Sequence, residues 1–76
     1  MNNFKINDIV YTGLTGDVVK ITSIHKLSSS IFSGEVIKHL DGAYPTYHAP
    51  VGFKSDSWWA PVFQKYEYKL KNIKIV

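Results

Sequence analysis

The chain has 76 residues, a formal net charge of +3, no cysteine and no arginine, and 45% of its residues are hydrophobic. This length allows one domain, and the missing thiols exclude a disulfide framework or a thiolate metal site. Because arginine is the usual bidentate reader of guanine and phosphate, its absence argues against sequence-specific DNA recognition.

Apolar and polar residues alternate with a period of two in most of the chain, which predicts strands instead of helices. A turn at Asn7-Asp8 leads into a first strand at 9–11, and turn signals follow at 12–16. A second strand runs from Asp17 to about Ile24 and is rich in β-branched residues.

The clearest strand spans 31–40, with Phe32, Gly34 and Val36 on one face. A glycine in the middle of a strand indicates a bulge or a sharp bend. Asp41-Gly42 is a strong hairpin signal, so 44–48 is expected to return as the partner strand of 31–40.

The last third of the chain predicts one short 3-10 or helical turn near 57–63 and an alternating strand at 64–70. Five or six short antiparallel strands of this spacing favour a small β-barrel, with residues 1–76 as a single domain. Apolar residues at the end, Ile73, Ile75 and Val76, should close the barrel or pair across a homo-oligomer interface.

Trp58 and Trp59 stand side by side. Full burial of one tryptophan is worth roughly 4–6 kcal/mol gross, so a domain this small can hardly expose both. Since neighbouring residues usually point in different directions, we expect Trp58 to plug the core beside Phe63. Trp59 is then partly exposed and available as a contact residue, in keeping with the enrichment of tryptophan at interface hot spots.

The opening FKINDIVYTG resembles the start of SH3-like barrels, including the KOW type. The stretches FSGEVIKH and GFKSDSWWAPVF are similar to small uncharacterised proteins of phages and prophages in low-GC bacteria. The matching positions are Phe32, Gly34, Val36, Gly52, Ser55, Trp58 and Phe63. The resemblance implies an SH3-like fold and, by analogy, a phage protein that inhibits a host or defence protein. It transfers no catalytic residue.

No arrangement of residues predicts an enzyme, a cofactor or a metal site. His25, His39 and His48 lack metal-ligand spacing, although histidines on different strands can converge. The scattered aspartates lie mostly at turns, where they commonly bond the backbone. The alternative is an enzyme or small-ligand site built between the subunits of an oligomer.

The segment 43–54 interleaves aromatic rings with prolines and a lysine, which is typical of a binding surface. The predicted contact residues are Tyr44, Tyr47, His48, Lys54 and Trp59. We expect a protein as the partner. Weak, lysine-driven nucleic-acid binding is the alternative, and Tyr44 and Phe53 could instead belong to the core.

The chain is expected to act in the cytoplasm and away from membranes. Its first ten residues contain no apolar run long enough for a signal peptide. No stretch approaches the ~20 apolar residues of a membrane-spanning helix.

Overall fold

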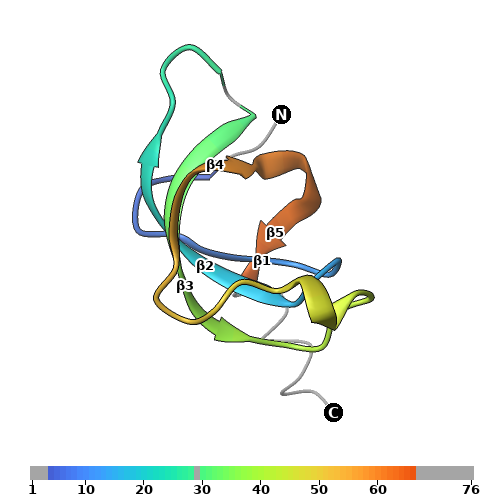
Figure 1. Cartoon of the computed structure of the whole chain (residues 1–76). Helices are drawn as coiled ribbons and strands as arrows, with labels where there is room; N and C mark the ends of the chain where they lie inside the picture. Colours follow the sequence, from blue (N-terminus) through green and yellow to red (C-terminus); the bar gives the residue numbers. More distant parts are fainter. Residues whose placement is uncertain (1–3, 29, 67–76) are drawn as a thin grey trace.

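A computed structural model describes residues 4–28 and 30–66 as an all-β, barrel-like fold (Figure 1). Five antiparallel strands form one sheet in the order β4-β3-β2-β1-β5, so the predicted fold class is confirmed. The elements are β1 (Ile9–Thr12), β2 (Asp17–Ile24), β3 (Ile31–His39), η1 (Pro45–Tyr47), β4 (Lys54–Trp59), η2 (Ala60–Val62) and β5 (Phe63–Lys65). The sheet curls, and the short 3-10 turn η2 joins its two outermost strands, β4 and β5 (Figure 1).

The core lies inside this curl, where the alternating strands direct their apolar residues. Val10, Val19, Ile21, Phe32, Val36, Ala60 and Phe63 are buried together. The Phe32 ring makes edge-to-face contacts with Phe4 and Phe63, at centroid distances of 6.2 and 5.2 Å. These contacts join the N-terminal segment, β3 and β5, which are far apart in the sequence.

Gly34 marks an irregularity in β3, as its position in the strand predicts. The pairing register of β3 shifts on both sides, between Ile21 and Ser23 in β2 and between Phe32 and Gly34 opposite β4. A Cβ atom at position 34 would lie 2.6 Å from Val19 Cγ1 and 2.7 Å from the Lys20 carbonyl oxygen. Only glycine allows β2 to approach β3 this closely.

The predicted hairpin at Asp41-Gly42 and the predicted strand at 44–48 are wrong. After β3 the chain runs along the β1–β2 turn, where the amides of Leu40, Ala43 and Tyr44 donate to carbonyls of residues 13–16. Gly16 has a φ of +85°, and a side chain there would overlap the Leu40 carbonyl. Pro45 then begins η1, because it has no amide hydrogen for a strand ladder.

The strand that pairs with the outer side of β3 is β4, with Phe32 opposite Trp58 and Ile31 opposite Trp59. The predicted helical turn near 57–63 is present but shorter, since Ser57 to Trp59 are extended and only η2 is a 3-10 turn. A local sequence pattern does not reveal that β3 offers a free edge to these residues.

The end of the described chain pairs with the first strand: β5 lies against β1, with Thr12 opposite Phe63. Ile73, Ile75 and Val76, for which barrel closure or a homo-oligomer interface was predicted, lie outside the described residues. Within 4–28 and 30–66, no helix is long and apolar enough to cross a membrane.

Candidate binding site

An apolar pocket of about 320 Å³ is lined by residues of the β1–β2 turn, the segment after β3, β4, η2 and β5. One side is the β1–β2 turn with Leu14, and the other is formed by β4 and η2. The lining residues are Thr12, Leu14, Thr15, Asp17, Tyr47, Ala49, Phe53, Trp58, Trp59, Val62 and Phe63. Five of these residues are aromatic: Tyr47, Phe53, Trp58, Trp59 and Phe63.

Trp58 forms the inner wall of the pocket. Its indole N–H donates to the Gly34 carbonyl over 2.9 Å. Its ring packs edge-to-face on Phe53 and Phe63, with centroids 6.0 and 5.8 Å away. The predicted contact with Phe63 is confirmed, and Trp58 packs against the core although it is only half-buried.

Trp59 points the other way, because successive residues of a strand face opposite sides. It is 56% exposed, as predicted, and it contributes to the pocket rim. Trp58 is thus fixed by a hydrogen bond and two rings, whereas Trp59 offers a large apolar surface to the solvent.

The segment that follows β3 exposes further apolar side chains, and Tyr47 and Phe53 from it line the pocket. Of the nine large hydrophobic side chains that are exposed within the described residues, five lie between 44 and 59. They are Tyr44, Tyr47, Val51, Phe53 and Trp59. Such clustering is uncommon on a protein that stays alone and marks interaction surfaces. Tyr44 and Phe53 are therefore not core residues, which settles that alternative.

The predicted contact residues divide into two groups. Tyr47 and Trp59 lie together at the pocket, while Tyr44 and Lys54 are exposed outside its lining. His48 is exposed, but its ring stacks on that of His39, with centroids 3.9 Å apart and planes inclined by 21°. His48 therefore belongs to a second, polar cluster.

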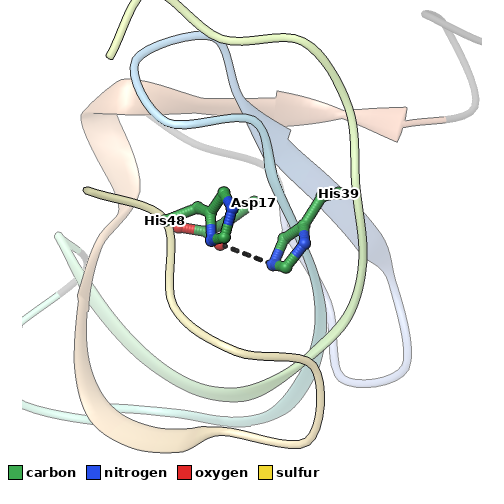
Figure 2. A group of neighbouring side chains, drawn as sticks. All are labelled: Asp17, His39 and His48. Carbon is green, nitrogen blue, oxygen red and sulfur yellow. Dashed lines mark ion pairs between the residues drawn. The ribbon is translucent and has the colours of Figure 1, made fainter. Parts of the chain in front are cut away.

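This second cluster consists of Asp17, His39 and His48, which come from the start of β2, the end of β3 and the segment after η1 (Figure 2). His39 Nε2 lies 3.6 Å from Asp17 Oδ1. One potential metal-ligand atom from each side chain lies within 4.8 Å of the other two. The arrangement brings two imidazoles and one carboxylate close together.

Asp17 is almost fully buried, and its carboxylate accepts two hydrogen bonds. Oδ2 accepts from the Thr15 hydroxyl over 2.6 Å, and Oδ1 accepts from the Ala49 amide over 3.0 Å. The Ala49 carbonyl in turn lies 2.5 Å from His39 Nε2. Through these bonds, Asp17 and His39 fasten the segment after η1 to the barrel.

The sequence pattern does not predict that Asp17 and His39 lie beside His48. An aspartate after Thr15-Gly16 is ordinary turn chemistry, and the histidines are nine residues apart in different structural settings. Only the unexpected path of residues 40–48 brings His48 onto the end of β3. No local spacing signal could have indicated it.

The lysines on the sheet do not form a single-sign patch. Lys20 and Lys54 lie on either side of Glu35 in the pairing register of β2, β3 and β4. Lys65 Nζ is 3.7 Å from Asp8 Oδ2. Lys69, Lys71 and Lys74 lie outside the described residues. Carboxylates among cations weaken the attraction for phosphate, which gives the nucleic-acid alternative no added support.

The chain was compared with protein-family models, with curated proteins and with solved structures. None of them matches it.

Proposed function

We propose that the protein is a non-catalytic β-barrel module that binds another protein through the aromatic pocket and the adjoining segment 44–53. The observation that carries this proposal is that three exposed aromatic residues, Tyr47, Phe53 and Trp59, line the same pocket. Exposed aromatic residues around a preformed cavity are typical of the anchor positions of protein interfaces.

The shape of this surface favours a protein over a small molecule. A volume of about 320 Å³ is at the low end of small-ligand sites, which span roughly 300–1,000 Å³. Tyr47 and Trp59 are more than half exposed, so a small ligand would leave much of their surface in water. A partner protein that inserts an apolar side chain can cover the pocket and the neighbouring rings together.

The partner is then a protein with an exposed apolar side chain that fits between Leu14, Tyr47 and Trp59. The sequence resemblance to phage and prophage proteins suggests a bacterial host or defence protein as the source of that side chain. Inhibition of that protein is the biological role that follows from the resemblance.

The test is a comparison of immobilised wild-type protein with Tyr47→Ala and Trp59→Ala in lysate of a low-GC bacterium. Any captured protein is purified, and its affinity for each variant is measured by calorimetry. Loss of a central aromatic anchor should weaken binding by at least about 2 kcal/mol, or roughly 30-fold.

Leu27→Ala is the matched control, because Leu27 is fully exposed at a remote loop. The control should bind as well as wild type. Thermal melts should show that all three variants are folded. A captured protein whose affinity is the same for wild type, Tyr47→Ala and Trp59→Ala would contradict the proposal.

A further inference from the structure

We propose that Asp17, His39 and His48 form a binding site for a divalent transition-metal ion of the zinc type. The proposal does not rest on protein binding at the aromatic pocket, although Asp17 also lines that pocket. It rests on the convergence of one carboxylate and two imidazoles from three separate segments (Figure 2). Two histidines and one carboxylate are a ligand set that occurs in zinc proteins with an open fourth position.

The distance between two of the three ligand atoms is close to what such an ion requires, whereas the His48 ring must turn out of its stack on His39. Two ligand atoms on one tetrahedral Zn²⁺, each at about 2.0–2.1 Å from it, lie roughly 3.3–3.4 Å apart. Asp17 Oδ1 and His39 Nε2 are 3.6 Å apart, so this pair needs a shift of only a few tenths of an ångström, and the His48 ligand atom, which lies within 4.8 Å of them, needs a larger one. The His48 side chain is exposed and can adjust without disturbing the core.

The surroundings of Asp17 also suit a ligand. The Thr15 hydroxyl holds Oδ2 and the Ala49 amide holds Oδ1, which fixes the direction of the carboxylate. Outer hydrogen bonds of this kind orient metal ligands and influence affinity. Metal binding must replace the hydrogen bond between His39 Nε2 and the Ala49 carbonyl, because a ring nitrogen that binds a metal carries no proton.

The donor set selects the kind of ion. Imidazole nitrogens suit Zn²⁺, Ni²⁺ and Cu²⁺, whereas Mg²⁺ and Ca²⁺ prefer oxygen ligands. An ion at this point would connect β2, β3 and the segment after η1. Because a ligand that binds only the folded state stabilises it, metal binding should raise the melting temperature.

The experiment is calorimetric titration of the untagged, chelator-treated full chain with ZnCl₂, and separately with MgCl₂. We expect one Zn²⁺ per chain and no saturable Mg²⁺ binding. At a free Zn²⁺ concentration a hundredfold above Kd, Tm should rise by roughly 10–20 °C. No saturable Zn²⁺ binding, or equal binding of Mg²⁺, would overturn the proposal.

Two variants and one control locate the ion. His48→Ala removes an exposed ligand and should fold normally. Asp17→Asn removes the negative charge of the carboxylate but keeps a side-chain oxygen that can accept the hydrogen bond from the Ala49 amide. Each should lower Zn²⁺ affinity by at least about 10-fold, since even outer-sphere changes cost about 10- to 100-fold. His25→Ala removes the histidine that contacts the Asp56 carbonyl and should bind Zn²⁺ as wild type does. Unchanged affinity in His48→Ala, or an equal loss in His25→Ala, would show that these residues hold no specific metal site.

Discussion

Two regions of this molecule use apolar residues in opposite ways. In β1, β2 and β3 most of the large apolar side chains are buried at least in part, and Val10, Val19 and Phe32 are almost completely buried. In the segment between β3 and β4 the rings of Tyr44, Tyr47 and Phe53 face the solvent. The first region stabilises the fold, whereas the second offers a surface.

The difference arises from the interactions that hold each region in place. The strands are held by ladder hydrogen bonds and by burial of apolar area, which scales with the surface removed from water. The segment after β3 is held by backbone bonds to the β1–β2 turn and by the carboxylate of Asp17. Because polar bonds hold the backbone of this segment, Tyr44 and Tyr47 can stay largely exposed, and substitutions should therefore affect the two regions very differently.

The largest effect is expected from Phe32→Ala in the core. Phe32 is 1% exposed and contacts both Phe4 and Phe63. Truncation of a buried phenylalanine costs about 3–5 kcal/mol, which is a large part of the stability of a small domain. Urea denaturation should show a largely unfolded variant at room temperature. A midpoint close to that of wild type would mean that the core does not depend on this ring.

A smaller loss is expected from Gly34→Ala, at the close approach of β2 and β3. The added methyl group would meet Val19 Cγ1 and the Lys20 carbonyl, and overpacking of this kind typically costs about 1–3 kcal/mol. Gly13→Ala is the control, because a Cβ atom there has no heavy atom within 4 Å. Thermal melts that show equal losses for both variants would contradict the steric explanation.

Thr15→Val tests how strongly the Asp17 carboxylate holds the segment between β3 and β4 to the barrel. The variant keeps the side-chain shape but removes the hydroxyl that donates to Asp17 Oδ2 over 2.6 Å. A hydrogen bond to a charged group contributes about 1.5–3 kcal/mol when buried, and this partly buried one should contribute about 1–2 kcal/mol. Amide hydrogen exchange should increase at Ala49 more than in β3. A uniform increase would place Thr15 in the cooperative core instead.

The smallest effect on stability is expected from Tyr47→Ala. Tyr47 is 77% exposed, and substitutions at such positions usually change the free energy of unfolding by less than about 0.5 kcal/mol. Its melting temperature should therefore lie within a few degrees of wild type. A loss comparable to that of Gly34→Ala would show that the exposed rings support the fold.

The alternating residues determined much of the fold. Phe32, Gly34 and Val36 share the buried face of β3 as their parity predicts, and the glycine coincides with a register shift. Strand parity is a local property, since successive side chains of an extended backbone point to opposite faces. The outward position of Trp59 follows from the same rule.

The tertiary structure alone decided where the chain goes after β3. Asp41-Gly42 predicts a hairpin, but the backbone of 40–44 bonds to the β1–β2 turn, where Gly16 and Gly42 allow contact that any Cβ atom would prevent. That path brings His48 to Asp17 and His39, and it places Tyr47 at the pocket. These pairings join residues about 10 to 30 positions apart, and their energies depend on distances that a one-dimensional pattern does not contain.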